Sequence, residues 1–275
     1  MKKGETGVST YIYYFTATGN SLYIAKMLGN IIPDSKIISI LQSNKKEETS
    51  LEADKIGFVF PLYYGGIPRV LEQFIKNLEI KGHPEIFAVA TRGSSTGMVK
   101  SQINKLMLPK KIQLNYLTYI NMPSNYVRLY DMKEKQENKS IILNAKDEAI
   151  KAAHEIERGI NKVENDSMIA NLIYKPMYKF WKKSLRRKDN KFTINDDCNR
   201  CGTCVKICPV NNIILDDGNP KWLHNCEDCM ACIHICPKKA INIGRRTQQR
   251  RRYRNPFIDV KEIIDQKITK ENVID

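Results

Sequence analysis

The sequence predicts an α/β protein built on a parallel sheet, followed by a small cysteine-rich module. Two observations lead to this fold class. From Tyr11 to Ile120, short apolar runs alternate with helical patterns, as in βαβ units whose strands are buried on both faces. All eight cysteines then lie between Cys198 and Cys236. At 275 residues, the chain has room for one large domain or two modest ones.

Strands and helices of the sheet region are expected in alternating order. The expected strands are Tyr11–Phe15, Lys36–Ile40, Lys55–Phe60, Glu85–Thr91 and Ile112–Ile120. The expected helices are Ser21–Gly29, Pro68–Leu78, Thr96–Leu108 and a long one from about Asn138 to Asn161. The long helix should close the sheet domain, because it carries apolar residues at core spacing. These residues are Ile141, Ile142, Ala145, Ala149, Ala152, Ala153, Ile156 and Ile160.

A further helical stretch, Met168–Lys188, links the sheet region to the cysteines. It mixes aromatic side chains with lysines and arginines, is interrupted by Pro176 and ends in a basic run. Two interpretations are open. We favour a connector packed between two domains, and the alternative is a helix that lies on a membrane surface.

The formal net charge of +15 is unusual, whereas the contents of charged residues (27%) and hydrophobic residues (42%) are ordinary. Such an excess favours contact with an acidic protein, a nucleic acid or an anionic membrane. No apolar run approaches the ~18 residues that a membrane helix needs. The apolar stretch Tyr11–Phe15 is also too short for the core of a signal peptide. We therefore expect a cytoplasmic protein without a transmembrane segment.

Basic segments bracket the cysteine module. Lys182–Lys188 precedes the module, and Lys238–Arg254 follows it without any acidic residue. The module itself carries acidic residues at Asp196, Asp197, Asp216, Asp217, Glu227 and Asp228. One interpretation of the second basic segment is a solvated tail that only aids solubility. The other interpretation, which makes a functional prediction, is a docking surface for an acidic redox partner.

The cysteines form two groups with the same spacing, Cys-x-x-Cys-x-x-Cys-x-x-x-Cys-Pro, which is typical of bacterial ferredoxins with two [4Fe-4S] clusters. Three thiolates on a tight loop can bind three corners of a cubane, and the fourth begins a helical turn that points towards the other cluster. One cluster should use Cys198, Cys201, Cys204 and Cys236, and the other should use Cys226, Cys229, Cys232 and Cys208. Structural zinc is the alternative, but zinc sites usually pair two Cys-x-x-Cys units across a longer gap.

An anion site is predicted where the first strand ends. Thr16-Ala17-Thr18-Gly19-Asn20-Ser21 leads from that strand into a helix, and hydroxyls with free backbone N–H groups at a helix N-terminus bind anions. The loop has neither the pattern for a triphosphate nor the pattern for a pyrophosphate, so a terminal monophosphate is expected. A plain turn with a helix N-cap is the alternative.

Two later loops follow strands of the same sheet. Pro61–Pro68 contains two tyrosines and two glycines, and Thr91–Gly97 is rich in small polar residues. Ligands of such sheets bind at the carboxyl ends of the strands, near the switch point. Together the three loops could hold a planar ring with a phosphorylated tail.

The strand–Thr-x-Thr-Gly-Asn-Ser–helix opening resembles the phosphate loop of the flavodoxin family, and the two later loops fall where flavodoxins hold the isoalloxazine ring. The resemblance covers about residues 9 to 165 and implies a flavodoxin-like doubly wound parallel sheet that binds FMN. It implies phosphate contacts at Thr16, Thr18, Gly19, Asn20 and Ser21. It implies ring contacts at Tyr63, Tyr64, Gly65, Gly66, Thr91, Arg92, Gly93 and Gly97. The last loop lacks an aromatic residue, so the stacking ring would be Tyr63, Tyr64 or Tyr126.

The whole chain resembles the flavodoxin–ferredoxin fusion proteins of anaerobic bacteria and archaea, including the closing segment Arg252–Pro256. This resemblance implies a flavodoxin-like domain at 1–165 and a helical basic connector at 166–190. It also implies a small α+β ferredoxin-like domain at 191–245 and a basic tail at 246–275.

Electron transfer is the function that we expect. A flavin exchanges one or two electrons and each cluster passes one, so electrons would move between FMN and the clusters and on to an acidic redox partner. One alternative is a flavin-dependent reductase of a small acceptor such as a quinone or free flavin, so the question of an enzyme stays open. The other is a regulator that binds nucleic acid, which we disfavour because no helix-turn-helix or RNA-binding signature is present. No catalytic residue is assigned, and the four histidines are interpreted as surface or packing residues.

Overall fold

A six-stranded sheet forms the larger part of the molecule in the computed structural model, which describes residues 9–42, 52–93, 97–166 and 168–267. All paired strands are parallel, in the order β2-β1-β3-β4-β5-β6. The strands are β1 Thr10–Tyr14, β2 Ser35–Ser39, β3 Lys55–Pro61, β4 Glu85–Arg92, β5 Leu114–Asn121 and β6 Lys162–Val163. The parallel α/β class predicted from the alternating pattern is confirmed, and only the two-residue β6 was not foreseen.

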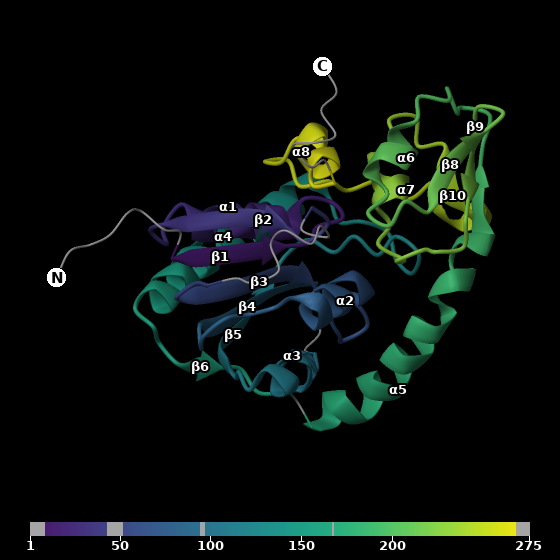
Figure 1. The fold of residues 1–275 in the computed structure, drawn as a ribbon. Coiled ribbons are helices and arrows are strands. Elements are labelled where there is room, and N and C mark those ends of the chain that lie inside the picture. Colours follow the sequence, from purple (N-terminus) through teal and green to yellow (C-terminus); the bar gives the residue numbers. More distant parts are fainter. Residues whose placement is uncertain (1–8, 43–51, 94–96, 167, 268–275) are drawn as a thin grey trace, which may run out of the picture.

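Helices cover both faces of the sheet, as Figure 1 shows. Helices α1 (Asn20–Gly29) and α4 (Lys135–Glu157) pack together on one face, and α2 (Arg69–Asn77) and α3 (Val99–Met107) pack on the other. The chain reverses its direction of winding beside β1, so the loops after β1 and β3 open at the switch point.

Element ends differ from the sequence expectations by a few residues. Helix α4 ends at Glu157, so Ile160 lies beyond it and is exposed, not part of the core. The expected start of α3 at Thr96 lies outside the described residues. Helix ends are set by capping contacts that apolar periodicity does not report, which explains these differences.

The cysteine module is a small α+β unit, as expected. Strand β7 pairs with β10 in an antiparallel ladder, and β8 pairs with β9 in a hairpin. Two short helices, α6 and α7, pack against each other between them. The bounds are β7 Phe192–Ile194, α6 Thr203–Ile207, β8 Ile213–Asp216, β9 Asn219–Trp222, α7 Ala231–Ile235 and β10 Ile241–Ile243.

Helix α5 (Met168–Ser184) runs along the edge of the molecule and joins the two parts (Figure 1). Its inner face is anchored on the loop after β3, where the Tyr178 hydroxyl donates to the Ile67 carbonyl at 2.7 Å. Trp181 is buried one turn later. Two 3-10 turns, Leu185–Arg187 and Asp189–Lys191, then lead into the module. No helix in the described part of the chain is both long enough and apolar enough to cross a membrane.

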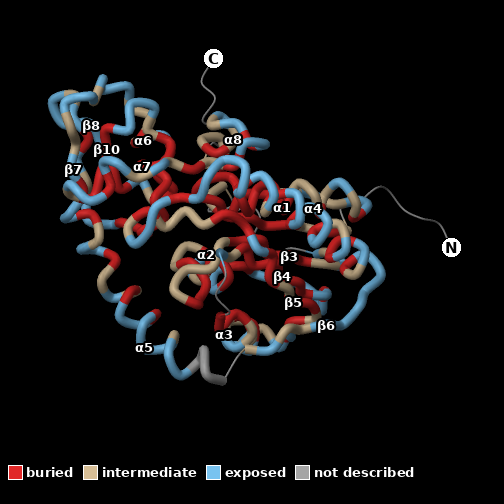
Figure 2. Tube along the Cα trace, turned by 180° about the vertical axis from the view of Figure 1, so that it is seen from behind, coloured by how far each residue is buried: buried red, intermediate tan, exposed pale blue. Residues whose placement is uncertain are grey.

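The basic C-terminal segment folds back onto the sheet domain instead of extending into solvent. After a 3-10 turn, η5 (Gly244–Thr247), it crosses to the loop after β1 and ends in α8 (Val260–Asp265). One cluster of buried side chains extends from the α1 and α4 face through the module to this segment, and Figure 2 shows buried stretches of the chain in each of these parts. The interpretation as a solvated tail is therefore wrong for the described residues up to 267, and residues 268–275 lie outside them.

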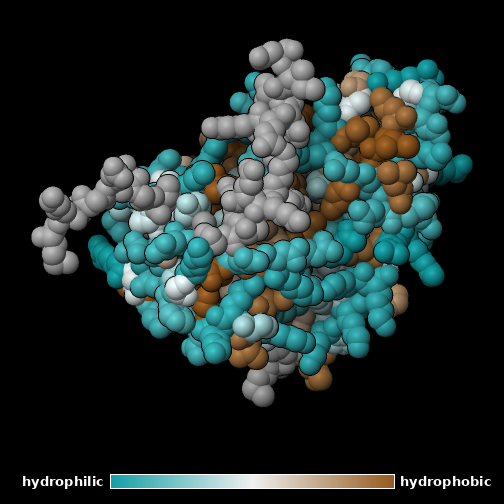
Figure 3. Space-filling model, in the orientation of Figure 1, coloured by the Kyte–Doolittle hydropathy of each residue, from teal (hydrophilic) through white to brown (hydrophobic). Residues whose placement is uncertain are grey.

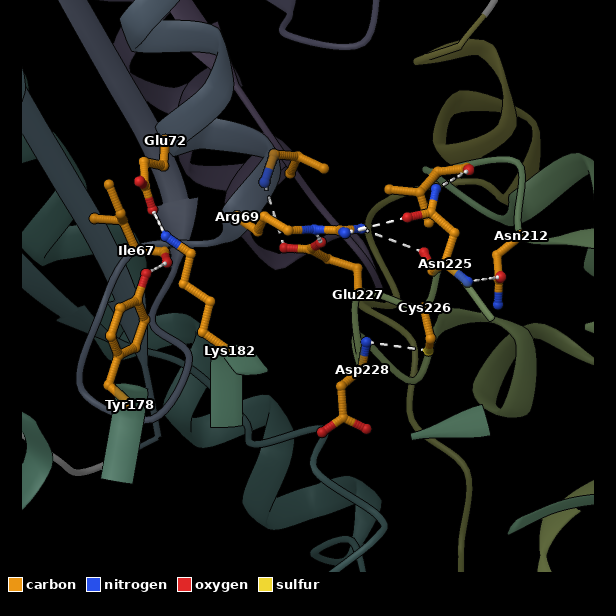
Figure 4. Close-up of polar contacts among 12 residues, drawn as sticks. Ile67, Arg69, Glu72, Tyr178, Lys182, Asn212, Asn225, Cys226, Glu227 and Asp228 are labelled. Atoms are coloured by element: carbon orange, nitrogen blue, oxygen red, sulfur yellow. Dashed lines mark hydrogen bonds and ion pairs between the residues drawn. The ribbon is translucent and has the colours of Figure 1, made fainter. Parts of the chain in front are cut away.

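Two buried carboxylates of the second cysteine loop fix the module to the sheet domain. Glu227 accepts from Arg69 Nε at 3.0 Å at the start of α2, and Arg69 also donates to Asn225 (Figure 4). Asp228 accepts from Arg128 Nη2 at 2.8 Å and from the Trp181 indole at 3.1 Å. Of the acidic residues that the sequence shows in the module, these two are buried, and each is paired with donors, as a buried carboxylate requires.

Arg128→Ala tests this attachment. It leaves the buried carboxylate of Asp228 without its main cation, so the free energy of unfolding should fall by about 3–5 kcal/mol. Lys76→Ala is the control, because its ion pair with Glu72 is exposed and should contribute at most about 1 kcal/mol. Urea titration followed by circular dichroism measures both. Equal, small losses for the two variants would show that the Asp228 contact does not stabilise the fold.

Candidate functional site

The loop between β1 and α1 has the geometry of an anion site. Gly19, the residue before α1, has a φ of 96°, which favours glycine, and its N–H donates to Thr16 Oγ1 at 3.1 Å. A Cβ there would also lie 3.0 Å from Cβ of Ile258 in the returning segment. The helix N-terminus therefore points its free N–H groups out of a tightly held turn.

Hydrogen bonds join this loop to the other loops at the same edge of the sheet. Ser21 Oγ lies 2.8 Å from Thr91 Oγ1 near the end of β4, and the Asn125 amide donates to Thr18 Oγ1 at 3.1 Å. Asn20 donates to the Pro123 carbonyl at 2.9 Å. The segment after β5 is thus a fourth part of the site, and of its residues the sequence singled out only Tyr126.

A cavity of about 640 Å³ lies beside these loops. This volume is in the range of cofactor sites. The predicted residues on its wall are Thr16, Thr18, Asn20, Ser21, Tyr63, Tyr64, Thr91, Arg92, Gly93 and Tyr126. The wall also includes residues that the sequence did not single out for this site, among them Asn125, Tyr130, Met177, Trp181 and Asp228.

Four predicted glycines are not part of the cavity wall: Gly19 of the anion loop and three of the predicted ring contacts, Gly65, Gly66 and Gly97. A Cβ on Gly65 would meet the ring of Tyr174, and one on Gly66 would meet the ring of Tyr178. Gly97 packs against the Gly65 carbonyl, 2.8 Å from where its Cβ would be. The latter three glycines let the loops and α5 approach each other. The rest of the loop after β4, Ser94–Thr96, lies outside the described residues.

Aromatic rings form one side of the cavity. Tyr64 stacks on Trp181 with 5.5 Å between ring centroids, and the Tyr64 and Tyr126 hydroxyls lie 2.6 Å apart. Tyr63 meets Trp181 edge-on at 5.9 Å. Arg92, by contrast, turns its guanidinium over the ring of Tyr119 and donates to Asn121. The aromatic spacing of α5 (positions 174, 178 and 181) is a signal that could have identified Trp181 as an inward-facing residue.

The eight cysteines surround two small enclosed sites. We call the first the outer site, and it is lined by Cys198, Cys201, Cys204 and Cys236. The second, the inner site, is lined by Cys208, Cys226, Cys229 and Cys232. Each site thus takes its fourth cysteine from the other group, which is the crossed arrangement that the spacing predicts. Four thiols around one enclosed space are the donor set that a [4Fe-4S] cluster requires.

The two cysteine loops share one backbone conformation. Gly202 and Met230 occupy matching positions, with φ values of 71° and 65°. Met230 adopts this conformation although it has a side chain. It is buried and lines the inner site. Backbone N–H groups donate to sulfur in both sites, from Ala240 to Cys236 at 3.3 Å and from Asp228 to Cys226 at 3.2 Å. Such bonds influence the reduction potential of a bound cluster.

The outer and inner sites differ in their access to water. Cys201 is exposed, and hydrogen bonds from Thr203 lower the pKa of its thiol. Every cysteine of the inner site is buried, and burial raises the pKa of the Cys226 thiol to about 12. A cluster in the inner site would therefore be shielded from water more fully than one in the outer site.

The inner site and the cavity share a wall. The backbone N–H of Asp228 donates to Cys226 of the inner site, and Asp228 also lines the cavity. Tyr63 lines the cavity as well, and burial raises the pKa of its hydroxyl well above its usual value, as do the nearby charges of Cys229 and Glu227. That hydroxyl is buried without a hydrogen-bond partner in the described part of the chain. A group in the cavity would thus lie one residue layer from a group in the inner site.

The returning C-terminal segment supports the anion loop from behind. The Tyr253 hydroxyl donates to Asn20 Oδ1 at 2.6 Å, and the Asn255 N–H donates to the Thr18 carbonyl at 2.9 Å. Farther along, Gln266 donates to the Thr16 carbonyl at 3.1 Å. We call residues 253–266 the C-terminal strap. It was not foreseen, because nothing in the sequence links it to a loop more than 230 residues away.

His234 connects the module to both the strap and the cavity. Its Nδ1 accepts from the Tyr253 N–H at 3.0 Å, so its Nε2 carries the proton that is donated to the Asn125 carbonyl at 2.6 Å. Burial lowers its pKa to about 4, which keeps the ring neutral near pH 7. This histidine is a packing residue, as predicted for all four, but it also positions Asn125 beside Thr18.

Two family models match the chain. Residues 11–188 match a flavodoxin domain, and residues 184–241 match a 4Fe-4S dicluster domain. No curated protein matches. Among solved structures, a flavodoxin from the domain Archaea is 18% identical, with 54% of this chain and 98% of that chain covered and a TM-score of 0.37. The azoreductase from Bacillus anthracis str. Sterne is 14% identical, with 54% of this chain and 99% of that chain covered and a TM-score of 0.37. The two-electron reduced flavodoxin of Megasphaera elsdenii is 14% identical, with 53% of this chain and 98% of that chain covered and a TM-score of 0.35.

Tyr253→Phe tests the support that the strap gives to the anion loop. It removes one buried hydrogen bond to Asn20, so the dissociation constant for FMN should rise about fivefold. Tyr116→Phe is the matched control, because it also removes one tyrosine hydrogen bond, to Glu155, but away from the cavity. Anaerobic fluorescence titration of flavin-free protein measures both. If both variants bind FMN equally well, the strap does not contribute to the loop's affinity.

Proposed function

The chain belongs to the flavodoxin domain family and continues into a 4Fe-4S dicluster domain, and from this premise we propose that it carries electrons between one FMN and two [4Fe-4S] clusters and on to a redox partner. Flavin and iron–sulfur electron transfer follows from the two domains. The identity of the flavin, the number of clusters and the residues that hold them are the proposal.

The wall shared by the cavity and the inner site carries this proposal. Asp228 lines the cavity, and its chain neighbours Glu227 and Cys229 line the inner site, so a flavin in the cavity would be the neighbour of the inner cluster. Exposed Cys201 belongs to the outer site. We propose the order flavin, inner cluster, outer cluster, partner, with the protein supplying distance, shielding and charge.

FMN would be held in two parts. Its phosphate would bind the anion loop at Thr16, Thr18, Gly19, Asn20 and Ser21, where N–H groups and hydroxyls converge. Its ring would lie against the aromatic wall, with Trp181 a further candidate beside Tyr63 and Tyr64. We propose domain limits of 1–165 and 191–245, with 166–190 as a connector that also lines the cavity.

A reductase of small acceptors is the second candidate, because the cavity opens to solvent. Leu129, Tyr130 and Met177 line it and are exposed. A quinone or a free flavin could approach a bound ring by this side. Turnover of such an acceptor in the absence of any partner protein would favour this candidate over a carrier.

The cluster order is tested with Cys208→Ser and Cys236→Ser in anaerobically prepared protein. Wild-type protein should contain one FMN and about eight iron and eight sulfide ions. Because Cys208 lines the inner site, its loss should stop electrons from passing from a photoreduced flavin to either cluster. Cys236→Ser should leave the first transfer intact and stop delivery to a partner.

Stopped-flow visible spectroscopy follows the flavin and the clusters separately. Damage from Cys208→Ser confined to the site of Cys198, Cys201 and Cys204 would refute the crossed ligands. A flavin that reduces the clusters normally in Cys208→Ser would refute the proposed order.

We also propose that the partner is acidic. Exposed cations lie beside the outer site and just after it, at Lys238, Lys239, Arg245 and Arg246. Figure 3 shows hydrophobic surface gathered over the same module, and Ile214, Leu215 and Leu223 are exposed there. The three consecutive arginines that follow are already engaged. Arg250 donates to Val127, Arg251 pairs with Asp131, and Arg252 donates to Asn242.

Arg245→Glu/Arg246→Glu tests the charge of the partner. Electron transfer to an acidic carrier protein should slow about tenfold at low salt and lose most of this difference at high salt, because exposed charges are screened. Lys139→Glu/Lys146→Glu on α4 makes the same change of net charge on a face away from the module. Equal rates for both double variants would remove the exposed arginines from the docking surface.

A further inference from the structure

Helix α5 has two faces with different roles. Tyr174 and Tyr178 turn inward against the glycines after β3, and Trp181 is buried. The opposite face carries large apolar side chains that touch little of the protein. Their exposed fractions are high for such residues, at 80% for Leu172, 52% for Ile173 and 75% for Phe180.

Positive charge flanks this apolar face. Lys175, Lys179 and Lys183 are exposed along the same helix, and Arg186 and Arg187 continue the series in the following turn. No acidic residue occurs from Met168 to Lys188. Lys182 differs from these lysines, since it turns inward and pairs with Glu72 of α2 (Figure 4). We call the outward residues Leu172, Ile173, Lys175, Lys179, Phe180 and Lys183 the α5 face.

The α5 face stands at the edge of the molecule. In Figures 1 and 2, which show opposite sides, α5 forms the outline between α3 and the cysteine module, and no other element reaches beyond it. A flat surface could therefore meet the whole length of the helix. The face is a convex ridge, which suits a planar surface better than it suits insertion of a partner's side chains.

We propose that the α5 face binds the surface of an anionic lipid bilayer, with the helix lying in the plane of the headgroups. Apolar side chains on one side of such a helix enter the boundary of the acyl region, and lysines and arginines beside them attract anionic lipids. Neither interaction needs a bound cofactor. The sequence left two interpretations of this helix open, a connector packed between domains and a helix on a membrane surface. In this proposal both hold, because the inner face packs against the protein and the outer face binds lipid.

Vesicle sedimentation tests the proposal with the full chain carrying its cofactors. The probes are anaerobic vesicles of phosphatidylcholine alone, and of phosphatidylcholine with about one third phosphatidylserine. Binding to the anionic vesicles should be at least about tenfold stronger than to the neutral ones and should weaken with salt.

Two variants separate the contributions of the face. Phe180→Glu removes an apolar contact, and Lys179→Glu/Lys183→Glu reverses two charges. All three side chains are exposed, so the fold should be kept. Each variant should lower binding to the anionic vesicles about tenfold. The matched controls are on α4, where Leu143→Glu and Lys139→Glu/Lys146→Glu change exposed residues of the same kind and should leave binding unchanged.

Three results would overturn the proposal. They are no binding to anionic vesicles, binding that survives both α5 variants, and binding that the α4 controls reduce as strongly. Loss of electron transfer to an acidic carrier protein in the α5 variants, without vesicle binding in the wild type, would also overturn it and would assign the face to a protein partner. A failure of FMN or cluster binding leaves these outcomes unaffected, because the face contains no residue assigned to a cofactor.

Discussion

The arrangement of this molecule depends on the buried carboxylate of Asp228. A carboxylate without solvent is costly unless hydrogen-bond donors surround it. Here three donors come from two separate parts of the chain: the Tyr126 hydroxyl at 2.7 Å and the Arg128 guanidinium from the segment after β5, and the Trp181 indole from α5. The segment after β5, the connector helix and the second cysteine loop must therefore meet at one point. That point is the wall between the cavity and the inner site.

This constraint makes the two domains act as one structure. Glu227 gives a second attachment at the N-terminus of α2, where the Val70 N–H also faces the carboxylate. His234, carried by a helix of the module, positions both the segment after β5 and the C-terminal strap. The anion loop is thus supported by residues that the cysteine module holds in place. A flavin bound there would meet a site whose shape depends on the cysteine module.

Helix α5 shows how one segment can serve several purposes. Its inner aromatic residues complete the cavity, its last turns lead into the module, and its outer face stays free. A helix that only joined two domains would not need large apolar residues exposed to solvent, because their burial would stabilise the fold more. The exposed ridge and its lysines therefore indicate a surface to which the molecule attaches.

The sequence by itself determined the class of fold and the chemistry of the cysteines. Alternating strands and helices are local patterns, and a thiol spacing of two and three residues fixes which sulfurs can share a site, so both can be read along the chain. The anion loop was predictable for the same reason, since Thr16–Ser21 lie together in sequence. Only the tertiary structure decided that Trp181, Asp228 and the strap belong to the cavity or its supports. Periodicity shows that a side chain is buried but not what it packs against, and contacts such as Tyr253 with Asn20 join residues more than 230 positions apart.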